Sequence, residues 1–186
     1  MSLKQNTINH ILKIEGGYVN DPSDSGGETH FGITQRVARA HGYKGPMRDM
    51  PRAVAFTIYA TRYWDALSLD HVENLCPKVA QELADTGVNM GVGRAAEFLQ
   101  KTLNALNNQG QYYTDLAIDM DVGPATLRAL AMFMDSRGPE GEQVLVSALN
   151  ALQGAFYIDL TERRQKDEKY LYGWLLNRLA FKPADF

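Results

Sequence analysis

The first segment of the chain has the apolar spacing of an amphipathic helix that ends in a carboxylate. Ile8, Ile11 and Leu12 are spaced as residues of one helical face, and Glu15 falls on the same face. A glycine pair at 16–17 follows at once and predicts the end of the helix. On this face we expect the Glu15 carboxyl group to be poorly hydrated, and poor hydration disfavours the charged form of a carboxyl group. Acid catalysis near neutral pH needs a proton held in this way, whereas a glutamate turned to solvent would have no such role.

Beyond this helix the sequence is predominantly helical, apart from one turn-rich insertion. Residues 18–34 combine glycines and a proline with alternating polar and apolar residues, which predicts loops and a short β-hairpin. Pro51 and Pro77 stand at first-turn positions and predict two helices, the first of which runs to about Trp64. The predicted fold class is therefore α+β and predominantly α-helical, with a small hairpin after the first helix.

Length and charge narrow the class of protein. The 186 residues suffice for a real core, and Gly91 and Gly93 mark a boundary between two lobes. The 19 basic and 22 acidic residues give a net charge of −3 without a long single-sign block, which argues against nucleic-acid binding. The single cysteine, Cys76, excludes an internal disulfide and fits a reducing compartment. We expect a monomer.

Carboxylates and polar side chains gather in the turn-rich segment that follows Glu15. Asp21 and Asp24 lie on its glycine-rich loop, and Thr29 and His30 follow. Glycoside hydrolysis needs this inventory, because one carboxylic acid protonates the leaving oxygen and a second carboxylate activates water or stabilises the developing positive charge. A hydroxyl group can hold the attacking water in line.

Three segments, at 15–34, 58–65 and 85–91, resemble glycoside hydrolase family 108, a family of phage-type N-acetylmuramidases, or endolysins, with a lysozyme-like fold. Residues from about 92 to 180 resemble the predicted peptidoglycan-binding region that usually follows. The resemblance implies a lysozyme-like catalytic region at 1–92 and a helical peptidoglycan-binding region at 93–186. It also implies cleavage of the β-1,4 bond between N-acetylmuramic acid and N-acetylglucosamine in bacterial peptidoglycan, with Glu15 of the Glu-Gly-Gly motif as the catalytic acid.

The spacing of the more distant T-even-type phage lysozymes bears on the partners of Glu15. Those enzymes have a glutamate, eight intervening residues, an aspartate, five more residues and a threonine. Asp24 matches the first interval, and Asp21 is its main rival as second carboxylate. Thr29 follows one position early, and His30 stands where the threonine is expected. Either residue is therefore a candidate for orienting water.

Sugar contacts are expected from Tyr63, Trp64 and Asn89. A pyranose presents an apolar C–H face on which an aromatic ring can stack. Asn89 lies in a segment that lines the cleft of similar lysozymes and could bind an N-acetyl group. For the two aromatic residues the alternative is core packing, and for Asn89 it is a helix end before Gly91.

Other chemistries fit the sequence less well. The histidines and Cys76 lack the spacing of zinc ligands, so we expect no metal and no cofactor, and a zinc amidase is disfavoured. A cell-wall-binding or structural virion protein without catalysis is the alternative from another class. The aromatic segment 170–182 could touch a membrane, although a docked terminal helix is favoured. Without a signal peptide at its start, the chain would be made in the host cytoplasm and reach the cell wall through a separate membrane lesion.

Overall fold

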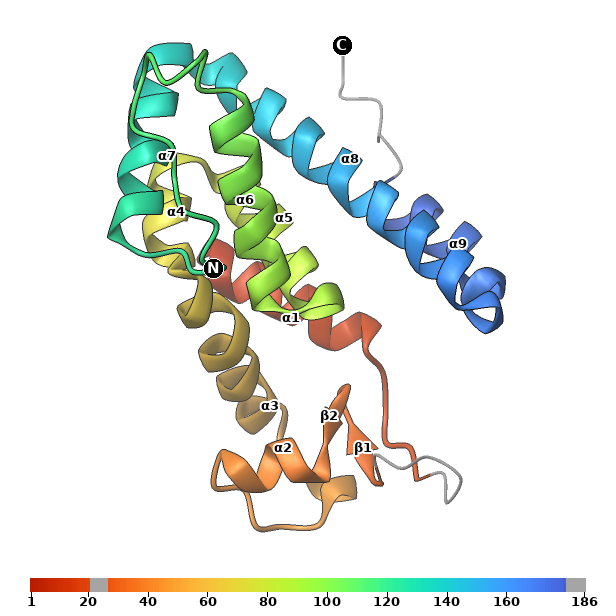
Figure 1. Ribbon diagram of the computed structural model, residues 1–186. Helices are drawn as coiled ribbons and strands as arrows, with labels where there is room; N and C mark the ends of the chain where they lie inside the picture. Colours follow the sequence, from red (N-terminus) through yellow and green to blue (C-terminus); the bar gives the residue numbers. More distant parts are fainter. Residues whose placement is uncertain (21–26, 180–186) are drawn as a thin grey trace. The chain divides into compact units, whose positions relative to one another are not determined.

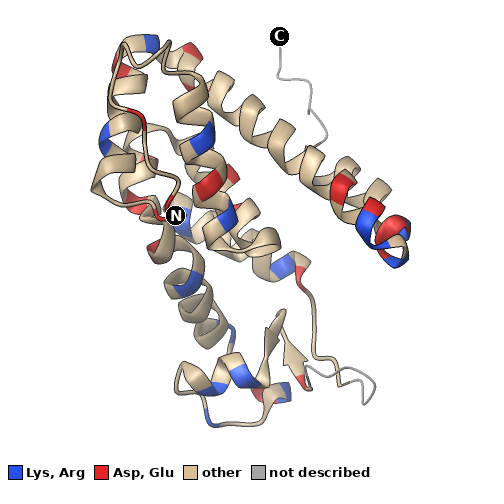
Figure 2. Ribbon diagram, viewed as in Figure 1, with Lys and Arg blue, Asp and Glu red and all other residues tan. Residues whose placement is uncertain are grey.

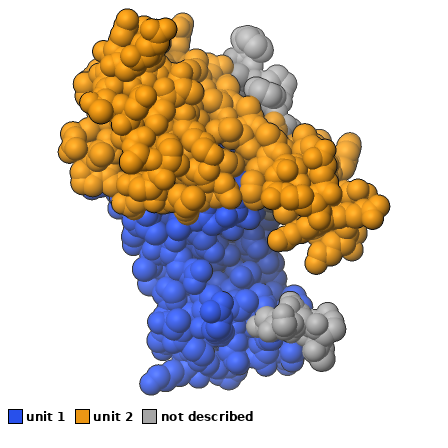
Figure 3. All heavy atoms as spheres, viewed as in Figure 1, with its two compact units in different colours: residues 1–92 blue, residues 93–186 orange. Residues whose placement is uncertain are grey.

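The computed structural model describes residues 1–20 and 27–179 and is mainly helical, with one small antiparallel sheet (Figure 1). This confirms the predicted fold class. The chain divides into two compact units, Met1–Val92 and Gly93–Phe186 (Figure 3). Acidic and basic residues both occur in each unit (Figure 2).

The first helix, α1 (Leu3–Ile14), begins and ends as its sequence predicts. The Ser2 hydroxyl accepts a hydrogen bond from the Gln5 backbone, and the Gln5 side chain accepts one from the Ser2 backbone. This capping box satisfies amide groups that have no partner within the helix. Ile8 and Leu12 are each 2% exposed, so the apolar face lies in the core.

The insertion after α1 contains the hairpin. Strands β1 (Thr29–His30) and β2 (Ile33–Thr34) pair antiparallel, with Thr29 opposite Thr34 and His30 opposite Ile33. The two turn residues between them, at 31–32, both have a positive φ, which the tight primed hairpin turns require. The hairpin is thus a short but fully defined turn.

Helices complete the first unit around α1. After the hairpin come α2 (Gln35–Ala40), η1 (Met47–Asp49), α3 (Arg52–Tyr59), η2 (Ala60–Trp64), η3 (Asp65–Leu67), α4 (Leu69–Leu75) and α5 (Pro77–Met90). The element η2 is a π-helical turn that continues α3. Because α1 packs against α3, η2 and α5, the end of α1 is held close to the helix that carries η2.

In the described part of the second unit, all regular secondary structure is helical. Its elements are α6 (Val92–Ala105), α7 (Pro124–Arg137), α8 (Pro139–Arg163), η4 (Gln165–Asp167), α9 (Glu168–Trp174) and η5 (Leu175–Leu179). Within the described part of the chain, α8 alone is long and apolar enough to cross a membrane, with a mean hydropathy of 1.3. A core helix passes the same test, and α8 packs against α7, α9 and η5.

The side-chain amides of Asn104, on α6, and Asn107, just after it, hold the long connection between α6 and α7. Asn107 is fully buried, and its Nδ2 donates to the Tyr113 carbonyl over 2.7 Å while its Oδ1 accepts from the Tyr113 N–H over 3.1 Å. Asn104 makes the same two kinds of bond to Leu116, each 2.8 Å long. The connection therefore has a fixed path, because its backbone groups are paired by side chains in place of a helix or sheet.

Candidate active site

Glu15 is the C-cap residue directly after α1, and its side chain lies against the hairpin. Its backbone has φ −68° and ψ −10°, and its N–H still donates to the Ile11 carbonyl over 2.9 Å. A Cβ atom at Gly32 would come within 2.8 Å of Glu15 Oε2 and 3.2 Å of Glu15 Cβ. Because Gly32 carries only hydrogen there, the half-buried carboxylate can occupy this space.

The hydroxyl group of Tyr59 converges on the same point from α3. A Cβ atom at Gly32 would also lie 2.9 Å from Tyr59 Oη, so this hydroxyl and the Glu15 carboxylate both approach the same side of Gly32. Tyr59 is only 4% exposed, and its Oη donates to the Phe31 carbonyl over 3.0 Å. Burial, the nearby Glu15 carboxylate and Tyr63 raise the pKa of Tyr59 well above its ordinary value. The hydroxyl therefore stays protonated and keeps its hydrogen bond to the turn.

A small pocket opens beside these groups. It has a volume of about 60 Å³, and its lining includes Gly32 and Thr34 of the hairpin together with Tyr59, Arg62 and Tyr63. This volume accommodates a few water molecules but is far below that of a pocket which encloses a whole ligand. The Glu15 carboxylate and a water-sized space thus share Gly32 as a common wall.

His30 and Thr29 of β1 differ in how firmly they are held. His30 Nδ1 lies 2.7 Å from the Met47 carbonyl, and its ring stacks on Phe31 with centroids 4.1 Å apart. Because a carbonyl oxygen only accepts, Nδ1 donates in this contact, which leaves Nε2 as the ring nitrogen that can meet water. The Thr29 hydroxyl lies 3.4 Å from the Gly27 carbonyl, which is a long contact. Which of the two orients water stays a prediction.

The structure does not describe either candidate for the second carboxylate. Asp24 and its rival Asp21 both lie at 21–26, outside the described residues. The chain on either side of this segment is fixed, because Val19 and Thr29 exchange two backbone hydrogen bonds of 2.8 and 2.9 Å. The choice between Asp24 and Asp21 stays a prediction.

The two aromatic residues expected to contact sugar have different surroundings. Tyr63 is half-buried, lines the small pocket and packs on Tyr59 with ring centroids 5.3 Å apart. Trp64 is 1% exposed, and its Nε1 donates to Asp70 Oδ1 over 2.7 Å. A ring enclosed on both faces cannot stack on a sugar, so burial corrects the expectation for Trp64, which is a core residue.

Asn89 is half-buried near the end of α5, and its Nδ2 donates to the Asp85 carbonyl of the same helix over 2.8 Å. This bond satisfies the amide locally, and sugar binding by Asn89 stays a prediction. The sequence did not reveal that Gly32 and Tyr59 lie beside Glu15, because no local pattern shows which residues far apart in sequence meet.

The described residues include no group of three or more His, Cys, Asp or Glu side chains arranged to hold a metal ion.

Comparisons with known proteins divide the chain near the same point as its two compact units. Residues 8–91 match the family model of glycosyl hydrolase 108, and residues 94–179 match that of a predicted peptidoglycan domain. None of the curated proteins matches. Among solved structures, SagA of Brucella abortus matches with a TM-score of 0.57 over 91% of this chain and 94% of the SagA chain. Its sequence identity is 23%, so this likeness concerns the fold alone.

The two family matches describe a glycosidase role related to peptidoglycan. Residues 8–91 therefore form a glycosyl hydrolase 108 region, and residues 94–179 form a predicted peptidoglycan domain after it.

Proposed function

We propose that the protein is an N-acetylmuramidase that cleaves the β-1,4 bond between N-acetylmuramic acid and N-acetylglucosamine in peptidoglycan. The observation that carries this proposal is the Glu15 carboxylate held against Gly32, beside a water-sized pocket, within the glycosyl hydrolase 108 region. A glycosidase requires such a carboxyl group at the scissile bond.

In the proposed reaction, protonated Glu15 gives its proton to the glycosidic oxygen as the bond from that oxygen to the anomeric carbon breaks. Asp24, or Asp21 in its place, balances the positive charge that develops on the sugar or removes a proton from the attacking water. The water oxygen forms the new bond to the anomeric carbon. No cofactor enters this scheme, because protonation and charge stabilisation are sufficient.

The proton on Tyr59 matters to this scheme. A neutral phenol that donates to the Phe31 carbonyl holds the turn in place without adding negative charge beside Glu15. His30 contributes in a different way, since its Nε2 can accept a hydrogen bond from water once Nδ1 is bound to Met47.

The biological setting follows from the resemblance to phage endolysins. We propose that the protein acts as a monomer in bacterial lysis, after synthesis in the host cytoplasm and release through a separate membrane lesion. Peptidoglycan is the expected partner, and no nucleic acid is expected.

The decisive experiment is digestion of purified Gram-negative sacculi by the wild type and by Glu15→Gln, with released ends identified by mass spectrometry after borohydride reduction. We expect new reducing muramic acid ends, and a loss of roughly 10³-fold in their rate of release with Glu15→Gln, since a general acid contributes about that much. Glu73→Gln, on α4 of the same unit, is the matched control and should retain activity.

Two results would contradict the proposal. New peptide amino termini with intact glycan would identify an amidase or peptidase instead. Sacculus binding without cleavage by the wild type would favour a cell-wall-binding or structural virion protein.

A further inference from the structure

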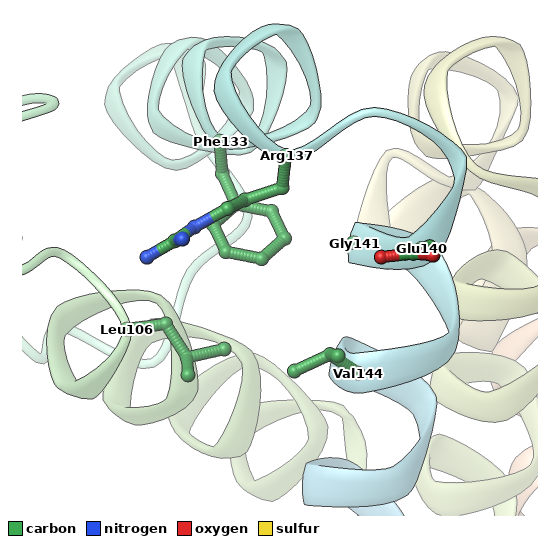
Figure 4. Close-up of a pocket in the computed structure, with 6 residues that line it drawn as sticks. All are labelled: Leu106, Phe133, Arg137, Glu140, Gly141 and Val144. Carbon is green, nitrogen blue, oxygen red and sulfur yellow. The ribbon is translucent and has the colours of Figure 1, made fainter.

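A second pocket lies within the second unit, where the end of α6 and the junction of α7 and α8 meet (Figure 4). Its volume is about 320 Å³, which falls in the range of small-molecule sites. It is lined by Leu106, directly after α6, by Phe133 and Arg137 of α7, and by Glu140, Gly141 and Val144 of α8.

Two glycines shape this junction. Gly138, between the helices, has φ +62°, a conformation that residues with a side chain rarely adopt. A Cβ atom at Gly141 would come within 2.8 Å of Arg137 Cβ and 3.1 Å of Phe133 Cε1, so glycine allows α8 to start close against the end of α7. The walls of the pocket are therefore fixed by backbone packing.

The interior of the pocket is apolar and partly open to solvent. Phe133 is 1% exposed and presents its ring to the pocket, whereas Val144 is 46% exposed. A ligand can cover the exposed aliphatic surface beside this buried ring. Each Å² of apolar surface that it removes from water contributes roughly 25 cal/mol to the free energy of binding.

Opposite charges stand at the rim. Figure 4 shows the Arg137 guanidinium and the Glu140 carboxylate on separate sides of the pocket, and none of the ion pairs between described residues joins them. The Arg137 guanidinium lies 4.9 Å from the centroid of the Tyr112 ring, a contact that restrains it. A cation and an anion flank an apolar surface, which complements a zwitterion on an aliphatic chain.

We propose that this pocket binds the peptide stem of peptidoglycan through the free amino-acid end of a diaminopimelate residue. That end carries a carboxylate and an ammonium group on a short aliphatic chain, so the carboxylate pairs with Arg137, the ammonium with Glu140, and the chain covers Leu106 and Val144. The proposal rests on peptidoglycan being the substrate. It also implies a preference for uncrosslinked stems, because crosslinking converts the ammonium group to a neutral amide.

Calorimetric titration of the full-length protein with the tripeptide L-Ala-γ-D-Glu-meso-diaminopimelate tests this site. The tripeptide that ends in L-Lys lacks only the distal carboxylate and should bind the wild type roughly tenfold more weakly, as expected for loss of one charge-assisted bond. Arg137→Gln and Glu140→Gln should each lower the affinity for the diaminopimelate peptide by roughly the same factor. The controls Arg164→Gln and Glu162→Gln, at the far end of α8, should leave the affinity unchanged.

Equal affinity of the wild type for the two peptides would overturn the proposal, and so would a wild type that binds neither peptide. Affinity for the diaminopimelate peptide that is unchanged in both pocket variants would also overturn it. Free meso-diaminopimelate that binds as tightly as the tripeptide would assign the pocket to a free amino acid instead. The sacculus assay, run in parallel on the wild type, separates the two hypotheses. Cleavage without peptide binding would overturn this inference alone, and peptide binding without reducing ends would overturn the muramidase proposal alone.

Discussion

The two units build their candidate sites in different ways. In the first unit, Glu15, Gly32 and Tyr59 come from α1, the hairpin and α3, and they meet at one point. In the second unit, Arg137 and Glu140 stand three residues apart across one helix junction. In the first arrangement every member comes from a different part of the chain, whereas in the second the charged pair comes from one local turn and packing adds Leu106. Substitutions in the first unit should therefore affect activity, and those in the second should affect binding or stability.

The sharpest way to break this comparison is Gly32→Ala. The added Cβ would meet the Glu15 carboxylate and the rigid, buried Tyr59 hydroxyl, so Glu15 must move. A displacement of about 1 Å can cost roughly 100-fold in rate, and we expect a loss of that size in reducing-end release from sacculi.

Gly42→Ala is the matched control for this prediction. Gly42 has a similar positive φ of +84°, but an added Cβ would meet no atom within 4 Å. The Gly42→Ala variant should therefore show the effect of backbone strain alone, which is a modest fall in melting temperature with normal activity. Equal activity losses in the two variants would mean that backbone strain, and not the position of Glu15, is responsible.

In the second unit the largest effect is expected from Asn107→Leu. This change leaves the buried Tyr113 N–H and carbonyl without their side-chain partner, at a cost of about 2 kcal/mol in the free energy of unfolding. Urea denaturation should show the loss, and hydrogen exchange should increase at 107–116.

Asn150→Leu, in the middle of α8, serves for comparison, since the Asn150 amide donates to the Val146 carbonyl of its own helix. Its cost should be smaller because the helical backbone there is already paired. If the two variants were equally stable, the Asn107 amide would have no special role in holding the connection between α6 and α7.

A smaller effect is expected from Tyr59→Phe. Removal of the hydroxyl leaves the Phe31 carbonyl unpaired and should cost about 1 kcal/mol of stability, with a several-fold fall in activity as the turn beside Glu15 loosens. Tyr43→Phe removes a similar hydroxyl-to-carbonyl bond, of 2.9 Å to Pro46, in an exposed loop and should leave activity intact. Full activity of Tyr59→Phe would show that this bond does not support the site.

The smallest expected effect is a change in the pH dependence of stability, which arises from Glu97 in the second unit. Glu97 is 6% exposed, and its carboxylate contacts Lys101 and Arg94 at 2.5 Å each. The hydrogen bond from Lys101, opposed by burial and assisted by Arg94, lowers the pKa of Glu97. A folded-state pKa below the unfolded one stabilises the protein above the ordinary glutamate pKa of about 4.3, and this contribution disappears as the pH falls through the lower value.

Urea midpoints of the wild type and Glu97→Gln, measured from neutral to acidic pH, provide the check. The stability difference between them should narrow on acidification, because protonated glutamate resembles glutamine in charge. A difference that stays constant with pH would show that the charge of Glu97 is not involved.

Several features of the fold were predictable from local pattern. The stripe of Ile8, Leu12 and Glu15 predicted α1 and its end, and the turn-rich segment predicted the hairpin. The resemblance of the Glu-Gly-Gly region to family 108 is confirmed by the family match at 8–91. Trp64 could not be placed in this way, because a tryptophan in an amphipathic helix has the same spacing whether it faces a core or a cleft.

The sequence by itself determined the helical periodicity, the glycine that ends α1 and the family, because each is written in neighbouring residues. Only the tertiary structure decided that Glu15 meets Gly32 and Tyr59, that Trp64 is enclosed, and that Arg137 and Glu140 flank an apolar pocket. The physical reason is that hydrogen bonding and periodicity act over a few residues. Burial and the meeting of distant side chains depend instead on how whole helices pack.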